Sequence, residues 1–587
     1  MLTKPLVAGR ASVERHGGRR PRKPIENLSQ LVADADRGEE QRPRTSPGER
    51  TVPGEEGPAL LAREGADLAV VQAADVGGVV PEEPEIPGEA AQHLVDDPPR
   101  RAGPAEGALG RHVGPGSARR VMSFDRPREP VRLFGTNGIR EVVGARLNAP
   151  FVTAVAGGIA RAVEPGRPIV VGWDGRTSSP ALARLMSATL TLGGHRVVEV
   201  GLLPTPAIQY NVPRLDAQLA VILTASHNPP EFNGIKCIAA DGLEVPREFE
   251  ERIEASVAAG EGRHVPYDEV GEVRTEHHGG ERYVAGILGQ VDVPAIAKRR
   301  FTVVLDCGNG ASVPTSPGLL RRLGCRVITL NGHVDGTFPG HLSEPTEANL
   351  ADLIRTVPAV GADLGIAHDG DADRAVIIDA TGRYIPGEQM LALLARDAVQ
   401  RAGGGVVVTP VSGSLGLEDA IRPFGGEVVY TRVGSPVVTR EMLRRHAVFG
   451  GEENGGLVFP GFQLARDGAM TAAATLDFLV RTSGTLADAL ADLPKYALVK
   501  EKVECPVALR DRVIETLGAA FTSEGGRIVT IDGLKVIRDD GWILLRPSGT
   551  EPLIRVFAEA KDRARAEALA RDGLTRVRAA IAQLASR

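Results

Sequence analysis

Short apolar runs alternate with amphipathic stretches from residue 122 onward, and one combination of them recurs three times. It consists of a β-branched strand, a helix that ends near glycine, and a second strand. In the first copy, strands are expected at 169–172 and 196–200 and the helix at 180–192. In the second, strands are expected at 301–305 and 326–330, with a helix that ends near 323–324. In the third, strands are expected at 406–409 and 427–431 and the helix at 415–423. Such β-α-β units favour parallel sheets with right-handed crossovers. The recurrence predicts three α/β domains of related fold.

The pattern changes in the last part of the chain. Four strands are predicted at 527–531, 534–538, 542–546 and 553–558, and a long helix follows at 563–585. Several strands followed by a helix are typical of an α+β domain. We therefore expect α/β domains at 122–272, 273–380 and 381–495 and an α+β domain at 496–587.

Residues 1–121 differ from the rest of the chain. They contain no Phe, Trp or Tyr, although the chain has 22 of these residues, and they hold 14 prolines and 16 glycines. A segment of this composition buries too little apolar surface to offset the entropy of ordering. We expect a disordered extension, or a start codon placed too early, with Met122 as the true start.

Composition excludes several classes of partner. Lys and Arg total 69 against 75 for Asp and Glu, and the net charge of -6 offers no basic face for a nucleic acid. No apolar run approaches the roughly 20 residues of a membrane span. The four cysteines form no C-x-x-C pair, which suits a reducing compartment. These features predict a cytoplasmic protein that binds small molecules, and they leave its oligomeric state open.

The first chemistry-bearing segment is Thr-Ala-Ser-His-Asn-Pro-Pro at 224–230, which follows the apolar run 219–223. Ligands of α/β folds bind at the carboxyl ends of strands, and the prolines stiffen the loop there. Ser226 is therefore a candidate nucleophile, although a serine hydroxyl needs a base or a metal to activate it. A turn that caps the next element is the alternative interpretation.

The second segment is His-Asp-Gly-Asp-Ala-Asp-Arg at 368–374, between two apolar runs. In extended backbone the carboxylates of Asp369, Asp371 and Asp373 would point the same way and could meet one hard cation. An EF-hand is excluded because Arg374 stands where that loop requires glycine. Arg374 is a candidate to pair with a phosphate. A solvated acidic turn is the alternative.

Two further segments carry groups that could bind a ligand, one a phosphate and the other sugar hydroxyls. The run Arg-Pro-Ser-Gly-Thr-Glu-Pro at 546–552, with Arg555 beyond it, offers hydroxyls, backbone N–H groups and two arginines to a phosphate. In Gly-Gly-Glu-Glu-Asn-Gly-Gly at 450–456, Glu452 and Asn454 alternate and suit adjacent sugar hydroxyls. An ordinary turn and a flexible acidic loop are the respective alternatives.

In this order the four segments resemble the α-D-phosphohexomutase family of phosphoglucomutases, phosphomannomutases and phosphoglucosamine mutases. The resemblance covers the chain from Leu133 onward and includes Phe-Gly-Thr-Asn-Gly-Ile-Arg at 134–140 and Asp-Gly-Thr-Phe-Pro-Gly-His at 335–341. It implies an α/β fold of three related domains with mixed sheets, plus a C-terminal α+β domain, around a central cleft. The variants present are most similar to archaeal-type phosphoglucosamine mutases.

The resemblance also implies roles for individual residues. Ser226 would be a phosphoserine whose phosphate, with Asp369, Asp371 and Asp373, binds Mg²⁺. Lys236 and Arg140 match basic residues near the phosphoserine. On physical grounds, Lys236 could serve as acid or base if the cleft lowers its pKa. The residues expected to hold the hexose phosphate are Arg374, Glu452, Asn454, Arg546, Ser548, Gly549, Thr550 and Arg555. The implied reaction interconverts hexose 6-phosphate and hexose 1-phosphate, with hexose 1,6-bisphosphate as intermediate and activator.

The sequence departs from the family pattern at two positions. Many members carry histidine where Gly456 stands, so an acid-base role is lost there, and Glu141 replaces the glycine that usually follows Arg140. Glucosamine phosphate is the expected substrate, with mannose and glucose phosphates as alternatives. More distant alternatives are a metal-dependent sugar phosphatase with Asp369 or Asp371 as nucleophile, and a non-catalytic sugar-phosphate sensor.

Overall fold

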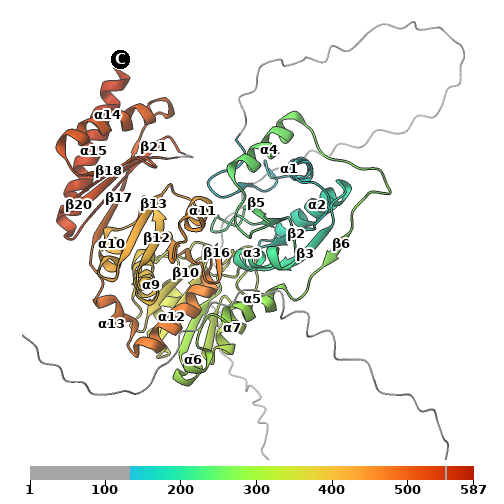
Figure 1. The fold of residues 1–587 in the computed structure, drawn as a ribbon, viewed down its shortest axis with the longest axis horizontal. Helices are drawn as coiled ribbons and strands as arrows, with labels where there is room; N and C mark the ends of the chain where they lie inside the picture. Colours follow the sequence, from blue (N-terminus) through green and yellow to red (C-terminus); the bar gives the residue numbers. More distant parts are fainter. Residues whose placement is uncertain (1–131, 549–550, 587) are drawn as a thin grey trace, which may run out of the picture. The chain divides into compact units, whose positions relative to one another are not determined.

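The computed structural model describes residues 132–548 and 551–586 (Figure 1). The expected extension at 1–121 lies outside these residues. Within the described part of the chain, no helix combines the length and the apolar character needed to cross a bilayer. Four sheets follow one another along the sequence.

The first sheet has six strands in the order β1-β5-β4-β2-β3-β6. Strands β2, β3, β4 and β6 are parallel, and β5 is antiparallel to both β4 and β1. The elements of this region are β1 (Ile139–Val142), α1 (Ala149–Ala162), β2 (Ile169–Trp173), α2 (Ser179–Leu192), β3 (Val197–Leu202), α3 (Thr205–Arg214), β4 (Leu219–Leu223), β5 (Phe232–Ala239), α4 (Arg247–Ala259) and β6 (Val273–Thr275).

The second sheet repeats this plan with five strands in the order β11-β10-β9-β7-β8. Strands β7, β8 and β9 are parallel, and β10 is antiparallel to β9 and β11. Its region contains α5 (Gly279–Leu288), α6 (Val293–Arg299), β7 (Thr302–Asp306), α7 (Ser316–Arg322), β8 (Arg326–Leu330), α8 (Ala351–Ala359), β9 (Leu364–His368), β10 (Ala375–Asp379) and β11 (Tyr384–Ile385).

The third sheet, in the order β13-β12-β14-β15-β16, is mixed in the same way. Strands β12, β13 and β14 are parallel, and β15 is antiparallel to its neighbours. The elements are α9 (Gly387–Ala402), β12 (Gly405–Pro410), α10 (Leu415–Ile421), β13 (Gly426–Thr431), α11 (Ser435–Arg445), β14 (Phe449–Gly451), β15 (Leu457–Phe459), β16 (Gln463–Arg466), α12 (Gly468–Thr482) and α13 (Leu486–Ala491). Three related α/β regions with mixed sheets are thus confirmed.

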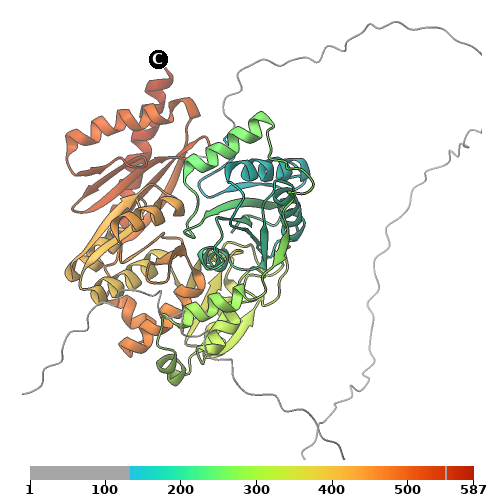
Figure 2. The same ribbon diagram turned by 45° about the vertical axis from the view of Figure 1, so that its right-hand side comes forward.

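The fourth sheet is entirely antiparallel, in the order β17-β21-β20-β19-β18. Its elements are β17 (Ala497–Glu504), α14 (Arg510–Glu524), β18 (Arg527–Val529), β19 (Leu534–Arg538), β20 (Gly541–Pro547), β21 (Leu553–Ala560) and α15 (Arg563–Ala585). Both views place α14 and α15 beside the sheet (Figures 1 and 2). The predicted α+β character is confirmed, although β17 and α14 were absent from the prediction.

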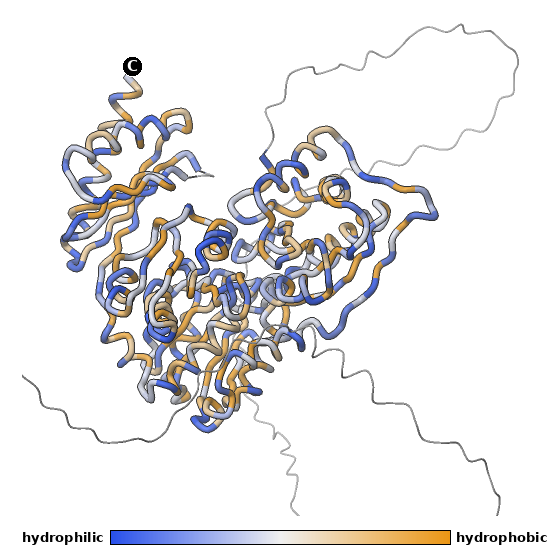
Figure 3. Tube along the Cα trace, viewed as in Figure 1, coloured by the Kyte–Doolittle hydropathy of each residue, from blue (hydrophilic) through white to orange (hydrophobic). Residues whose placement is uncertain are grey.

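Apolar side chains of the strands form the cores. Figure 3 shows hydrophobic positions along the strands of the fourth sheet, and residues such as Leu545, Ile554 and Val556 are fully buried there. A separate cluster that includes Val411 and Trp542 joins the segment after β12 to the fourth sheet. The adjacent Lys535 ammonium donates to two carbonyl oxygens after β12, at 2.7 and 2.8 Å. This contact fixes the fourth sheet to the third region.

All four chemistry-bearing segments occupy equivalent places in the fold. Each connects two antiparallel neighbours: β4 to β5, β9 to β10, β14 to β15, and β20 to β21. In the first three sheets the strand before the loop also pairs with a parallel neighbour. The repeated unit therefore presents one polar loop per region at the carboxyl end of a buried strand.

Gly234 in β5 tests how tightly the Ser226 hairpin is built. A Cβ there would overlap the carbonyl oxygen of Ile139 and lie 2.6 Å from that of Thr224. We predict that Gly234→Ala lowers the free energy of unfolding by about 1–3 kcal/mol, because backbone on both sides must move. Denaturant titration measures it. Gly318→Ala in α7, where the Cβ meets nothing within 4 Å, should instead stabilise by about 0.4–1 kcal/mol, and equal effects would contradict the packing account.

Candidate active site

Ser226 lies in the β4–β5 loop in a strained and fully buried position. Its φ of 52° falls in the left-handed region that residues with side chains rarely adopt. The Ser226 hydroxyl donates to Asp369 Oδ2 at 2.9 Å, and its backbone N–H donates to the Thr224 hydroxyl at 2.9 Å. The loop thus places the candidate nucleophile directly against the acidic segment 143 residues later.

Arg176, which follows β2, holds the Ser226 loop in this conformation. Its guanidinium donates to four carbonyl oxygens within residues 226–232, at 2.6–2.9 Å. Asp174 accepts from its Nε at 3.1 Å. Arg176 was not predicted from the sequence, although an Asp-Gly-Arg turn directly after an apolar strand indicates a residue of this kind.

Asp369, Asp371 and Asp373 converge, but by a different route from the one predicted. The segment is a turn and not an extended strand, since the Ala372 N–H donates to the Asp369 carbonyl and Ala372 has a φ of 57°. One oxygen from each carboxylate lies within 4.8 Å of the others. The turn therefore brings the three carboxylates close together, whereas an extended strand would only have placed them on the same side.

Positive charge surrounds these carboxylates unevenly. Burial opposes ionisation of Asp371, yet Lys236 Nζ at 2.8 Å and the Thr205 hydroxyl at 2.8 Å outweigh it and lower the pKa of Asp371. Burial, Asp373 and Asp371 together hold the pKa of Asp369 well above its usual range. Asp369 is therefore the carboxyl of the three that is hardest to ionise, and additional positive charge would favour its ionised form.

The donor set fits a divalent cation. Asp371 Oδ1 and Asp373 Oδ1 are buried without hydrogen-bond partners, and unpaired buried carboxylate oxygens are costly. Hard cations bind carboxylate oxygens, and their charge would offset the repulsion among three anions. The triad is thus the candidate metal site.

Glu452 is the first residue of the β14–β15 loop, and it forms an ion pair with a residue that was not predicted from the sequence. Arg466, at the end of β16, donates from Nη1 to Glu452 Oε2 at 2.5 Å and from Nη2 to Asp373 Oδ2. One buried guanidinium therefore joins the loop of the third region to the acidic loop of the second. Asn454 is exposed, and its side-chain oxygen accepts from the Gly456 N–H at 3.2 Å.

His227 is neutral in this environment. Arg374 Nη2 lies 3.0 Å from His227 Nδ1, and because arginine can only donate, Nδ1 is the acceptor. Burial, together with Arg374 and Arg140, lowers the pKa of His227 to about 2. Arg140 donates to Asn228 in the same loop at 2.8 Å. Arg374 and Arg140 therefore supply positive charge beside the Ser226 loop, and His227 does not.

The β20–β21 loop supplies the residues expected to hold a phosphate. Arg546 Nε donates to Asp532 at 2.8 Å, and Ser548 is buried. Arg555, half-buried in β21, pairs with Glu551 at 3.4 Å. Gly549 and Thr550 lie outside the described residues.

A cavity of about 720 Å³ gathers residues from all four regions. Its volume suits a ligand the size of a sugar bisphosphate. Its lining includes nine polar residues already described: Arg140, His227, Arg374, Glu452, Asn454, Arg466, Arg546, Ser548 and Arg555. Five of these nine are arginines, and all of the arginines except Arg466 were predicted from the sequence. The arrangement suits an anionic, hydroxyl-rich ligand.

Comparison with protein families agrees with this geometry. The models of phosphoglucomutase/phosphomannomutase alpha/beta/alpha domains I, II and III match residues 131–264, 281–382 and 386–496. The model of the C-terminal domain matches residues 497–574.

Relatives match over nearly their full length. A phosphoglucomutase/phosphomannomutase of Thermococcus kodakarensis is 40% identical over 74% of this chain and 96% of its own. Probable phosphoglucosamine mutases of Pyrococcus horikoshii and Methanopyrus kandleri are 39% and 40% identical, over 78% and 75% of this chain and 100% and 96% of theirs.

Solved structures resemble it too. A phosphoglucomutase/phosphomannomutase family protein from Burkholderia thailandensis has a TM-score of 0.68 at 28% identity, covering 76% of this chain and 97% of its own. A putative phosphomannomutase from Thermus thermophilus has a TM-score of 0.66 at 27% identity, covering 77% and 99%. The chain belongs to the phosphoglucomutase/phosphomannomutase family.

Proposed function

We propose that this protein is a phosphohexomutase that interconverts a hexose 6-phosphate and the matching hexose 1-phosphate, with Ser226 carrying the phosphoryl group. The proposal rests on the position of the Ser226 hydroxyl. It lies 2.9 Å from Asp369 Oδ2 of the acidic triad, and the adjacent His227 lines the cavity together with five arginines. A phosphatase using Asp369 or Asp371 would leave this serine and the Glu452 loop without a role. A non-catalytic sensor would not require the serine.

Asp369, Asp371 and Asp373, with a phosphate on Ser226, would hold Mg²⁺, which when bound stabilises negative charge on a transferring phosphoryl group. Arg374 and Arg140 would balance the charge of the phosphate beside the Ser226 loop. Lys236 is our candidate acid or base, and to act as one its ammonium must part from Asp371, to which it donates at 2.8 Å.

One serine must serve both ends of the sugar, so the bisphosphate intermediate turns end for end between two transfers. Glu452 and Asn454 would hold ring hydroxyls in both orientations, while Arg546, Ser548 and Arg555, with Gly549 and Thr550, grip the distant phosphate. Added hexose 1,6-bisphosphate would rephosphorylate Ser226 in enzyme that has lost its phosphate.

Glucosamine phosphate is the proposed sugar, in a cytoplasmic enzyme. The names of the Pyrococcus horikoshii and Methanopyrus kandleri relatives support it. Mannose and glucose phosphates are the alternative, supported by the Thermococcus kodakarensis relative.

We predict that Ser226→Ala lowers kcat by at least roughly 10³-fold, because it removes the hydroxyl that would accept the phosphoryl group. Peptide mass spectrometry of the active wild-type enzyme should find a phosphate on Ser226. Turnover by the alanine variant near the wild-type rate, or a phosphate on an aspartate, would refute the proposal.

Asp371→Asn should weaken Mg²⁺ binding and slow phosphoryl transfer, since one anionic ligand of a hard cation is neutralised while its shape is kept. Isothermal titration with Mg²⁺ alone separates the binding effect from catalysis. Wild-type Mg²⁺ affinity and full activity at low Mg²⁺ would argue against the triad as the metal site.

The sugar is tested by comparing kcat/KM for glucosamine, mannose and glucose 6-phosphates with Mg²⁺ present. We expect the highest value for glucosamine 6-phosphate. A higher value for either of the other sugars would favour the phosphomannomutase/phosphoglucomutase alternative, and no turnover of any of them would refute the mutase proposal.

A further inference from the structure

Arg466 occupies an unusual place in the candidate active site. It is 6% exposed, lines the cavity, and spans from Glu452 in the β14–β15 loop to Asp373 in the β9–β10 loop. A planar guanidinium with two nitrogens on two carboxylates fixes both distance and orientation between them. Besides the backbone hydrogen bond from the Ala375 N–H to the Gly455 carbonyl at 3.1 Å, this side chain joins the carboxylates of the two loops.

Gly456 is the residue that admits Arg466. Its φ lies outside the left-handed region, so the backbone there would accept a side chain. A Cβ at this position would overlap Cδ of Arg466 and lie 3.2 Å from its Cγ. The guanidinium is held at both carboxylates, so the aliphatic part of the side chain cannot swing aside without breaking a buried ion pair. Space, and not backbone conformation, requires glycine at position 456.

We infer that Arg466 is a positioning residue that orients Glu452 toward the sugar, and that Gly456 and Arg466 form an interdependent pair; the inference rests on the proposed function. Arg466 engages Oε2 of Glu452, and no other side chain among the described residues hydrogen-bonds to this carboxylate. Oε1 therefore stays available for a sugar hydroxyl. A permanently charged guanidinium transfers no proton, so Arg466 supplies orientation and leaves acid-base chemistry to other groups.

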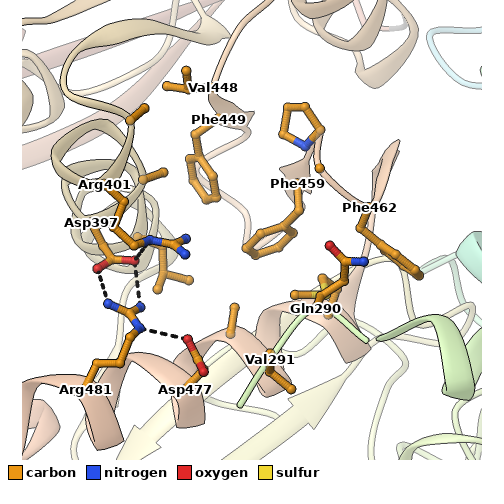
Figure 4. Close-up of a pocket in the computed structure, with 17 residues that line it drawn as sticks. Gln290, Val291, Asp397, Arg401, Val448, Phe449, Phe459, Phe462, Asp477 and Arg481 are labelled. Atoms are coloured by element: carbon orange, nitrogen blue, oxygen red, sulfur yellow. Dashed lines mark hydrogen bonds and ion pairs between the residues drawn. The ribbon is translucent and has the colours of Figure 1, made fainter. Parts of the chain in front are cut away.

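Arg481 in α12 provides a matched control. Like Arg466 it bridges two carboxylates, Asp397 and Asp477, at 2.8–2.9 Å. It does so beside a different cavity, lined by Phe449, Phe459 and other apolar residues (Figure 4). Losing this bridge should change stability without affecting the sugar.

A double-mutant cycle tests the coupling. Arg466→Gln and Glu452→Gln should each lower kcat/KM by roughly 10- to 100-fold. The kcat/KM of the double variant should be no more than about threefold lower than that of the less active single variant. Arg466→Lys, which keeps the charge but not the two-pronged contact, should recover only part of the loss. Arg481→Gln should stay within about twofold of wild type in kcat/KM while its Tm falls. Additive losses in the cycle, or wild-type kcat/KM for Arg466→Gln, would overturn the inference.

Two further measurements separate this inference from the proposed function. A crystal structure of Arg466→Gln should show the Glu452 carboxylate displaced, and an unmoved Glu452 would overturn the positioning role even if the wild-type enzyme turned over no hexose phosphate. Gly456→Ala should reproduce the kinetic loss of Arg466→Gln, and Gly456→Ala combined with Arg466→Ala should be no less active than Arg466→Ala alone. Wild-type kcat/KM for Gly456→Ala would show that the two residues are independent.

Discussion

Three carboxylates within 4.8 Å of one another can be buried only where positive charge surrounds them. The cations come from three regions of the chain: Lys236 from β5, Arg374 from the acidic loop's own hairpin, and Arg466 from β16. Without these contacts the three carboxylates would repel one another. The charge balance of one loop therefore ties the first three regions together at one point, in addition to the apolar core that they share.

The second requirement is conformational. Ser226 adopts a left-handed φ that the local sequence does not favour, and the four carbonyl contacts of Arg176 hold it there. Strain of this kind persists when the surroundings over-determine the backbone. The backbones of Ile139 and Thr224, which pack closely against Gly234 in β5, also restrict the hairpin that carries Ser226. The serine is thus placed before any ligand arrives.

Much of the fold could be predicted because the apolar periodicity of its strands is local. The acidic, serine and glycine-rich loops were found for a similar reason, since their polar residues stand directly after apolar strands. Strand β17 was missed because Lys500, Glu501 and Lys502 interrupt the apolar alternation of this strand, which lies at the edge of its sheet beside β21. Arg176 was missed although the Asp-Gly-Arg turn after β2 marks its place, whereas Arg466 was missed because its role depends on Asp373, which lies 93 residues away. Tertiary pairing of that kind leaves no mark in a local pattern.

The placement of one polar loop on each repeated hairpin has a consequence for how such an enzyme changes over time. A hairpin tip can be replaced without altering the strands that carry it, so a sugar loop can diverge while Ser226 and the acidic triad, which are hydrogen-bonded to each other, stay unchanged. Arg466 limits that independence. Because it ties Glu452 to Asp373, a new sugar loop must either keep a partner for this guanidinium or be acquired together with a change at position 466. Substrate range in this lineage is therefore expected to shift in paired steps.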